Sequence, residues 1–490
     1  MMCAMLTLPH GLGPRAQAVL PQTHPREGFR MTTVFTHTTV VTVDAGQTVL
    51  YDVALVVDGN TIATTGPTEA LLQAYPQAEV YDGHGKALFP GLINCHAHVT
   101  ATLNRGITED FGFPPDLHVP ASALSLLSAE ELTVMALLGA LESLKSGTTT
   151  VVENAQGIGV YAAALAQTGL RWVFAESGRD AEVPPGWRPG EDVHTFSPAL
   201  RGAALQRIHD LFTTWHRAQH GVITVFPAAA LAEASSPALL RAVRAFAEQH
   251  NLGYTIHLAQ SRLEIESMMR LRGMRPTFFL AAHDFLSPRL FAAHCRYVDA
   301  SEIALLGQSR TIVTHQAGMA ANRAVIPPIP ALRAAGCPIA MGTDNNSQDM
   351  LEVMRMGLVT ERILRDDAMQ PQPEDVLRET TRGGAYAVRQ QGDIGSLEVG
   401  KKADLIVVDT QRPHLVPTMR LVSAWIHNGQ AGDIEAVMVD GRFLMRDGRV
   451  LTMDEETIIR EADKIGRRAW NRLLERYPTA PFPTRVAPRL

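Results

Sequence analysis

The sequence has 490 residues, of which 46% are hydrophobic, and it carries a formal net charge of −6 at pH 7. This length exceeds one ordinary domain and suits a large barrel with a smaller companion domain. The composition excludes several classes of protein: no dense Lys/Arg run indicates a nucleic-acid or membrane partner, no apolar stretch reaches the ~18 residues of a bilayer span, and four cysteines do not make a disulfide framework.

The N-terminal segment, residues 1–30, precedes the first β-like pattern. It contains four prolines and lacks the sustained apolar region of a secretory signal. We expect a disordered extension, and Met31 is an alternative start of translation. The expected location of the protein is therefore the cytoplasm.

β-Forming residues cluster at both ends of the chain, with hairpin turns at Asp58-Gly59-Asn60 and Asp440-Gly441. This arrangement predicts a small β-sandwich built from both termini, over residues 31–90 and 393–453. The predicted β segments are Thr33–Val43, Ala54–Thr64, Val80–Lys86, Leu405–Val408, Ala424–His427 and Val437–Met445.

Between these ends, short apolar runs alternate with helix-like stretches, which predicts an α/β fold with a (β/α)8 TIM-like barrel over residues 91–392. Eight strands are expected near residues 91, 149, 173, 224, 255, 291, 312 and 339. A C-terminal helix and tail, residues 454–490, would cover the sandwich or a neighbouring subunit. The predicted helices are Ala129–Leu144, Gly202–Gln219, Pro237–Gln249, Met350–Leu364 and Asp454–Arg476.

Metal-competent side chains follow several of the predicted strands. His96 and His98 end the run that begins at Ala87, and side chains two apart on a strand project to the same side. Later apolar runs end at His257, His294 and Asp344. Because the C-terminal ends of barrel strands converge on one face, these residues predict a site for a divalent cation.

These motifs resemble those of the amidohydrolase superfamily, within the branch of triazine hydrolases, melamine deaminases and guanine deaminases. The resemblance covers about residues 34–450. The residues that carry it are Pro90–His98, His257 in Ile-His-Leu-Ala-Gln, His294 in Ala-Ala-His-Cys, Asp344 in Met-Gly-Thr-Asp-Asn, and Gly395–Asp409, with Leu103–Gly106, Glu142–Thr150 and Gly441–Leu451 in addition.

The resemblance implies one metal held by His96, His98, His257 and Asp344, with His294 orienting or activating the bound water. Asp344 would also accept the water's proton and pass it to the leaving group. Two-metal relatives usually bridge their ions with a carboxylated lysine, but no lysine lies between Lys145 and Lys401. A glutamate could replace this lysine, but the predicted fourth strand, Gly221–Pro227, ends with neither residue. We therefore expect a single ion, with zinc favoured and iron(II) as the alternative.

The sequence departs from the deaminase pattern at Gln260, where relatives usually have a glutamate that protonates a ring nitrogen. An amide can donate a hydrogen bond but cannot deliver a proton. Glu153, Glu176 and Glu233 lie near strand ends and are candidate replacement acids, although each is also explained as a structural carboxylate.

Further residues are candidate substrate contacts. His315 and Asn322 occupy positions of a His-Asn-Pro-x-Ser-Asn pattern in relatives, although packing of the barrel or bracing of a loop explains them equally well. Asn104 follows the first barrel strand. Gln260 and His294 complete the predicted substrate-binding set. Arg105 is equally explained by an ion pair, and Asn345 and Asn346 by helix capping.

We therefore predict a metal-dependent amidohydrolase that uses activated water to remove an amine or another leaving group from a nitrogen heterocycle of the triazine, purine or pyrimidine type. The alternative is hydrolysis of an amide, urea or cyclic-amide C–N bond, because a polarised carbonyl needs no ring protonation. A catalytically silent scaffold is the third reading. The expected partner is a small-molecule substrate, and the expected assembly is a homodimer or higher homo-oligomer.

Overall fold

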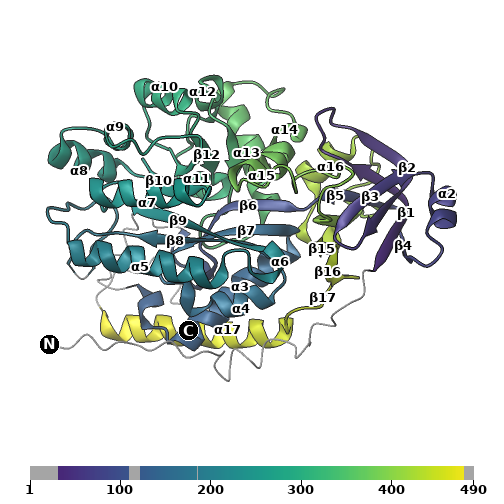
Figure 1. Ribbon diagram of the computed structural model, residues 1–490, viewed down its shortest axis with the longest axis horizontal. Helices are drawn as coiled ribbons and strands as arrows, with labels where there is room; N and C mark the ends of the chain where they lie inside the picture. Colours follow the sequence, from purple (N-terminus) through teal and green to yellow (C-terminus); the bar gives the residue numbers. More distant parts are fainter. Residues whose placement is uncertain (1–30, 110–121, 185, 479–490) are drawn as a thin grey trace.

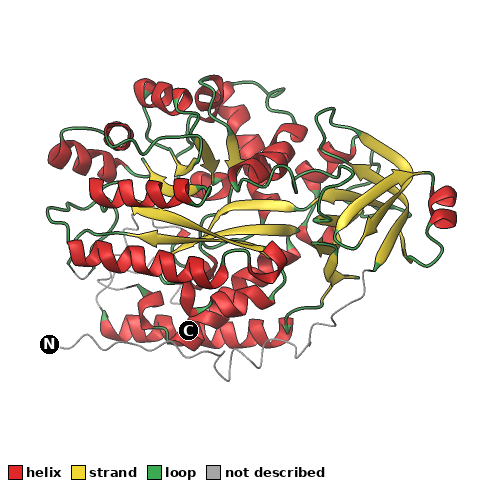
Figure 2. Ribbon diagram, in the orientation of Figure 1, coloured by secondary structure: helices red, strands yellow, loops and turns green. Residues whose placement is uncertain are grey.

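The computed structural model describes residues 31–109, 122–184 and 186–478, which form two separate sheets and their surrounding helices (Figure 1). The predicted extension over residues 1–30 lies outside the described residues. Figure 2 shows a helix-rich body with one sheet at its centre and a second, mainly β, region at one end.

The central sheet contains eight parallel strands, each paired with the next along the chain. The barrel closes where the Asp344 N–H donates to the His96 carbonyl and the His98 N–H donates to the Asp344 carbonyl, both at 2.9 Å. This arrangement confirms the predicted (β/α)8 barrel. The strands are β6 (Leu92–Ala97), β7 (Thr148–Ala155), β8 (Arg171–Gly178), β9 (Ile223–Leu231), β10 (Tyr254–Leu258), β11 (Leu290–His294), β12 (Ile312–His315) and β13 (Ile339–Met341).

Helices surround this barrel, and several of them begin at a side-chain cap. The Ser128 hydroxyl accepts from the Glu131 N–H in a capping box, and the Ser236 hydroxyl accepts from the Leu239 N–H. Among the described helices, none combines the length and the hydrophobicity that a membrane-spanning segment needs. The α-helices are α3 (Ala129–Lys145), α4 (Ala162–Gln167), α5 (Pro198–Trp215), α6 (Ala218–Gly221), α7 (Pro237–Gln249), α8 (Arg262–Arg272), α9 (Pro276–Ala282), α10 (Ala300–Gln308), α11 (Ala317–Asn322), α12 (Ile329–Ala334), α13 (Met350–Arg365), α14 (Pro373–Arg378) and α15 (Gly384–Ala387); shorter turns are η1 (Val99–Asn104), η3 (Ala123–Leu126), η4 (Ile158–Val160) and η5 (Glu379–Gly383).

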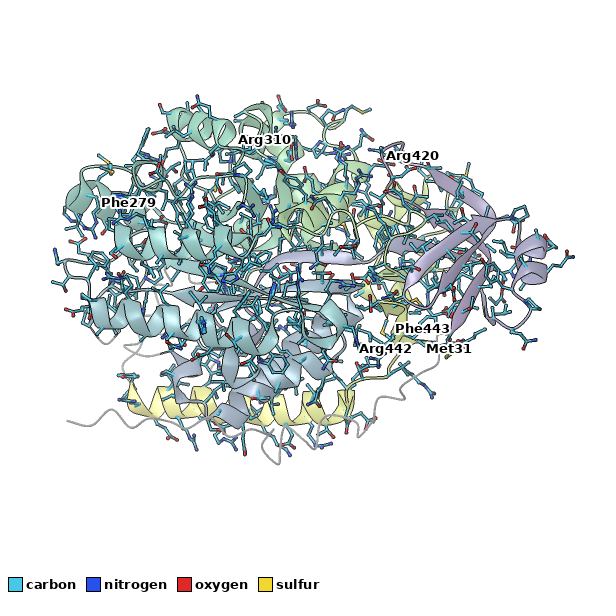
Figure 3. All side chains as sticks on the ribbon, viewed as in Figure 1. Met31, Phe279, Arg310, Arg420, Arg442 and Phe443 are labelled. Atoms are coloured by element: carbon cyan, nitrogen blue, oxygen red, sulfur yellow. The ribbon has the colours of Figure 1, made fainter. Side chains whose placement is uncertain are left out.

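The second sheet has nine strands drawn from both termini, in the order β17-β16-β15-β14-β5-β1-β2-β3 with β4 beside β1. It folds back on itself, because the rings of Phe35 and Phe443 lie 6.1 Å apart although three strands separate β1 from β16. Figure 3 labels Met31, Arg442 and Phe443 in this terminal sheet region. The strands are β1 (Thr32–Val41), β2 (Val49–Asp58), β3 (Thr61–Gly66), β4 (Glu79–Asp82), β5 (Lys86–Pro90), β14 (Leu405–Asp409), β15 (Ile434–Val439), β16 (Arg442–Arg446) and β17 (Arg449–Val450), with α2 (Thr68–Ala74) on this side.

Two details differ from the sequence analysis. The apolar run that begins at Ala87 is not one strand: β5 belongs to the terminal sheet and β6 to the barrel, with Gly91 between them. A Cβ on Gly91 would lie 2.1 Å from Thr149 Oγ1, so only glycine permits this close passage. Ala424–His427 is part of helix α16 (Leu421–Asn428) and not a strand, because its buried residues Val422, Trp425 and Ile426 follow a helical spacing; η6 (Ala431–Asp433) follows it.

The C-terminal helix α17 (Glu455–Arg476) runs along one side of the barrel and packs on α3 (Figure 1). The Trp470 indole N–H donates to the Leu103 carbonyl at 2.8 Å, and Arg468 pairs with Glu131 at 2.6 Å. Within the described chain, this helix therefore packs against the barrel.

Candidate metal centre and active site

Five side chains from the ends of four strands, β6, β10, β11 and β13, meet at the C-terminal face of the barrel. His98 Nε2 lies 3.3 Å from His257 Nε2, and Asp344 Oδ1 lies 3.9 Å from His96 Nε2 and 3.6 Å from His98 Nε2. His294 Nδ1 lies 4.0 Å from Asp344 Oδ2. Two overlapping groups, His96–His257–His294 and His96–His98–Asp344, each place one ligand atom per residue within 4.8 Å of the others. The structure thus brings together all five residues of the predicted centre.

Neighbouring carbonyl groups fix the orientation of two of these rings. His98 Nδ1 donates to the Asn154 carbonyl, and His257 Nδ1 donates to the Ala230 carbonyl at 2.7 Å. Because a carbonyl can only accept, each ring carries its proton on Nδ1 and directs the Nε2 lone pair toward the centre. This is the orientation that a metal-binding histidine requires.

Burial keeps the clustered histidines neutral. It lowers the pKa of His257 to about 4, lowers the pKa of His98, and holds the pKa values of His96 and His294 well below the ordinary value. Both ring nitrogens of His96 and Nδ1 of His294 are buried with no hydrogen-bond partner among the described atoms. Neutral imidazoles with free lone pairs next to a carboxylate fit a divalent cation of the zinc type.

The backbone at the centre adopts a rarely populated conformation. His294, Asp344 and Ala259 have φ values of 78°, 74° and 49°, in the left-handed region. Such residues cost on the order of 1–3 kcal/mol each and persist only where the surroundings hold them. One such support is Gln316, whose Oε1 accepts from the His294 N–H at 3.0 Å.

Asn94 and Gly342 bring the first and last barrel strands together, and the sequence analysis missed both. Asn94 Oδ1 accepts from the backbone N–H groups of His96 and Thr343, at 3.2 and 3.1 Å. A Cβ on Gly342 would lie 2.7 Å from the His96 backbone nitrogen. In the sequence, the only indication of a role for Asn94 was that it is a polar residue inside an apolar strand.

The three candidate replacement acids are all buried. Glu153 accepts from the Val99 N–H and the Tyr161 hydroxyl, at 2.9 and 2.8 Å, and burial raises its pKa to about 7. Glu176 accepts from the Gly157 and Ile158 N–H groups and pairs with Arg207. These contacts hold the loops that follow β6 and β7.

Glu233 follows β9, which extends to Leu231 and so beyond the predicted end at Pro227. Its Oε1 accepts from the Gly190 N–H at 3.0 Å, whereas Oε2 is buried with no hydrogen-bond partner among the described atoms. Burial raises the pKa of Glu233 to about 7, and burial together with Glu233 raises the pKa of Glu264 well above its ordinary value. Glu264 in turn accepts from the backbone N–H of Gln260 at 2.7 Å.

The predicted substrate contacts occupy different environments. Gln260 is 4% exposed and its Nε2 has no hydrogen-bond partner among the described atoms. Both ring nitrogens of His315 are also buried and unpartnered, and burial lowers its pKa to about 3. Asn322 lines a cavity of about 310 Å³, together with Thr343 and Asn345, which flank Asp344.

Asn104 and its neighbour Arg105 lie at the end of η1. Asn104 is half-buried and is not among the described residues that line this cavity, whereas Arg105 lines it. Arg105 pairs with Glu142 and donates to the Asn346 carbonyl, which agrees with the ion-pair reading. The N-cap of α13 is Asp349, so capping does not explain Asn345 or Asn346.

Two arginines that the sequence analysis did not single out complete the centre. Arg296, two residues beyond His294, and Arg323, after α11, each place a guanidinium nitrogen 3.8 Å from Asp344 Oδ2. Burial, and to a smaller extent the nearby positive charge of Arg323, lowers the pKa of Arg296 to about 10. Arg296 therefore stays protonated at pH 7.

Comparison with known proteins agrees with this fold. The profile described as the amidohydrolase family matches residues 87–444, and residues 54–78 match an imidazolonepropionase-like composite domain of bacteria. The chain belongs to the amidohydrolase family. The predicted class, hydrolases of carbon–nitrogen bonds other than peptide bonds that use a divalent metal, is thereby confirmed.

Within this family, the chain is similar to several named proteins. The chain is 31% identical over 431 residues to 5-methylthioadenosine/S-adenosylhomocysteine deaminase of Desulforudis audaxviator, covering 86% of this chain and 96% of the relative. It is similar to an adenosine deaminase from Xanthomonas campestris with bound zinc (TM-score 0.81, 25% identity, 90% of this chain and 99% of that one). It also shares its fold with atrazine chlorohydrolase from Arthrobacter aurescens complexed with zinc (TM-score 0.77, 22% identity, 89% and 100%).

Proposed function

We propose that this protein is a metal-dependent aminohydrolase that removes an amino group from a nitrogen heterocycle, with 6-aminopurine rings as the first candidates. The observation that carries the proposal is the convergence of four neutral histidines and Asp344 at the C-terminal face of the barrel. The printed names of the relatives, deaminases of adenosine and its derivatives, support the choice of purines.

The proposed metal ligands are His96, His98, His257 and Asp344, and the proposed ion is a single zinc. When bound, such an ion lowers the pKa of water from its bulk value toward about 7 and so supplies a nucleophile at neutral pH. The relative from Xanthomonas campestris with bound zinc supports this choice. Among the described residues, Glu233 is not part of either group that could hold an ion, which supports one ion and not a bridged pair.

The remaining chemistry is assigned to the protein's own groups. The Asp344 carboxylate accepts the proton of the nucleophile and transfers it to the departing amine. His294, with an unpartnered Nδ1 at 4.0 Å from Asp344 Oδ2, positions the nucleophile and polarises the carbon under attack. The unpartnered Nε2 of Gln260 donates a hydrogen bond to a ring nitrogen or to a carbonyl oxygen.

The same amide supports a second candidate function, hydrolysis of an amide, urea or cyclic-amide C–N bond. A carbonyl oxygen needs a hydrogen-bond donor and not a ring proton, and Gln260 can provide that donor. The two functions differ in their products, because aminated rings release ammonia whereas anilides and substituted ureas release an amine.

The decisive experiment measures the metal content of the purified protein and ammonia release from adenosine, 5′-methylthioadenosine, guanine, melamine and cytosine. We expect about one zinc per chain and turnover of at least one aminated ring. His257→Ala should lose both zinc and turnover, whereas the exposed His84→Ala should keep both. Turnover of anilides alone would select the second function, and a protein that holds no metal and turns over neither set would contradict both.

Gln260→Glu tests the role of this position. If the deaminated ring needs a proton, we expect the glutamate to raise deaminase kcat/KM by roughly 10²-fold, the usual gain from a positioned general acid. The exposed Gln249→Glu is the control and should change nothing. An unchanged rate on every aminated ring would contradict ring protonation at this site.

We also infer a cytoplasmic enzyme that acts on a small molecule as a homodimer or higher homo-oligomer. The absence of a dense basic run from the sequence supports a role without nucleic acid. Light scattering on the purified protein tests the assembly, and a monomer at micromolar concentration would contradict this inference.

A further inference from the structure

Arg296 is a buried cation whose hydrogen-bonding groups are not satisfied. The residue is 6% exposed, and its Nε and Nη2 have no hydrogen-bond partner among the described atoms. Among the described residues, Asp344 is the one acid recorded within 4.0 Å of the guanidinium, and its Oδ2 lies 3.8 Å from Nη2. That distance is too long for a hydrogen bond.

Three nitrogen-bearing groups from different elements surround this carboxylate oxygen. They are Arg296 Nη2 at 3.8 Å, Arg323 Nη1 at 3.8 Å and His294 Nδ1 at 4.0 Å. Asp344 Oδ2 itself is buried and has no hydrogen-bond partner among the described atoms. The four groups therefore define a small polar corner of the active site in which Asp344 Oδ2 accepts no hydrogen bond from its three neighbours.

The corner carries a net positive charge. Arg296 and Arg323 contribute two positive charges, and Asp344 contributes one negative charge. A divalent cation held by Asp344 would make the corner more positive. Buried charges are costly unless a counter-charge with good hydrogen-bond geometry accompanies them.

We propose that this corner binds a carboxylate carried by the ring of the substrate, so that the enzyme acts on acidic nitrogen heterocycles. This rests on the proposed function, because it places the carboxylate beside the reacting ring. The planar guanidinium of Arg296 presents Nε and Nη2 as a fork that matches the two oxygens of a carboxylate. Arg323 supplies the second cation.

A purely structural role for Arg296, holding the charge of Asp344, predicts a different geometry. The same chain contains such a pair: Arg171 is 4% exposed and donates from Nε and Nη2 to the two oxygens of Asp404, at 2.8 and 2.9 Å. In this pair, the buried arginine neutralises a carboxylate of its own protein through two short hydrogen bonds. Arg296 forms none with Asp344.

The test measures binding by calorimetry and so does not depend on turnover. The probes are purine-6-carboxylate and 6-methylpurine, two rings of similar shape that differ in charge and carry no amino group. With the zinc-loaded enzyme we expect a Kd at least ten-fold lower for the carboxylate. Arg296→Met should abolish this preference while zinc content stays at the parent value, and Arg323→Met should reduce it. Arg442→Met, an exposed change at the terminal sheet (Figure 3), should leave it intact.

Equal affinities for the two rings, no measurable binding of the carboxylate, or a preference that survives Arg296→Met would overturn the proposal. Its failure is distinguishable from that of the proposed function. An enzyme that releases ammonia from neutral rings and ignores purine-6-carboxylate refutes the anion corner alone. A protein that binds the carboxylate through Arg296 but hydrolyses no ring refutes the deaminase alone.

Discussion

Two buried arginines at opposite ends of the barrel differ in how well their charges are matched. Arg171 begins β8 at the N-terminal end of the barrel and forms two short hydrogen bonds to Asp404, next to the terminal sheet. Arg296 lies beyond β11 at the C-terminal end and has unpartnered donors beside Asp344. The pair at the first end joins the barrel to the terminal sheet, whereas Arg296 at the second end keeps donors that have no hydrogen-bond partner among the described atoms.

The difference follows the division of labour in barrels of this type, where the C-terminal face carries chemistry and the N-terminal face carries stability. The left-handed backbone of His294 and Asp344 and the free nitrogens of His96 occur at the same C-terminal end. These features lower the free energy of unfolding, so interactions elsewhere in the fold must offset them. Variants at the two ends should therefore separate activity from stability.

The largest effect is expected from Asp344→Asn at the C-terminal end. Asparagine keeps the size of the side chain and tolerates the left-handed backbone, but it cannot accept the proton. We expect turnover to fall by roughly 10²–10⁴-fold, the usual contribution of a general base. The matched control is Asp366→Asn, an exposed aspartate with φ 51°, which should keep full activity. Retention of more than a tenth of the parent rate by Asp344→Asn would remove this residue from the mechanism.

At the N-terminal end, Arg171→Met should destabilise the fold and leave the chemistry of the remaining folded protein unchanged. The substitution leaves the buried Asp404 carboxylate without its partner, which costs about 3–5 kcal/mol in comparable cases. Denaturant unfolding measures the loss, and Arg442→Met on the exposed side of the terminal sheet should shift the midpoint very little. A midpoint unchanged by Arg171→Met would show that this pair does not hold the barrel to the sheet.

The sequence predicts the barrel and the metal residues because both depend on local patterns. Strands that end in His257, His294 and Asp344 are short apolar runs, and the convergence of their ends follows from the barrel itself. Ala424–His427 was wrongly assigned because four apolar-rich residues carry no clear period. The helical spacing appears only when Val422 is included.

Other features of the centre depend on distances that no local pattern contains. The hydrogen bonds of Asn94 to Thr343 join residues 249 positions apart. Arg296 follows β11, and the residues beside it in the sequence do not indicate that it is buried. The charge of the corner could therefore be recognised only from the structure.

A smaller change in stability is expected from Glu233→Gln. This variant tests whether the charge of a buried carboxylate without a cationic partner lowers the free energy of unfolding near the centre. Burial raises the pKa of Glu233 to about 7, above its value of about 4.5 in the unfolded chain. A raised carboxyl pKa favours the folded state fully below about pH 4.5, and this contribution is lost as the pH rises through 7. Glutamine keeps the acceptor for the Gly190 N–H and removes the charge beside Glu264.

The variant should therefore match the parent protein near pH 5 and exceed its stability at pH 8 by roughly 1–3 kcal/mol. Thermal unfolding from pH 5 to 8 provides the measurement. Glu266→Gln, an exposed change on the same helix as Glu264, should follow the parent at every pH. A difference that does not grow with pH would contradict the assigned burial effect.

The smallest effect, and the most direct test of the contrast between the two ends, is the stability of Arg296→Met. Arg171→Met removes an arginine that is hydrogen-bonded to a carboxylate, whereas Arg296→Met removes an arginine whose N–H donors have no partner among the described atoms. Because an unsatisfied buried polar group costs about 1–3 kcal/mol, we expect the ligand-free, zinc-loaded variant to be as stable as the parent or more stable by about 1 kcal/mol. Denaturant unfolding of both arginine variants at the same zinc concentration makes the comparison. If Arg296→Met destabilises the protein as strongly as Arg171→Met, then Arg296 supports the fold, and the two ends of the barrel do not divide stability from binding in this way.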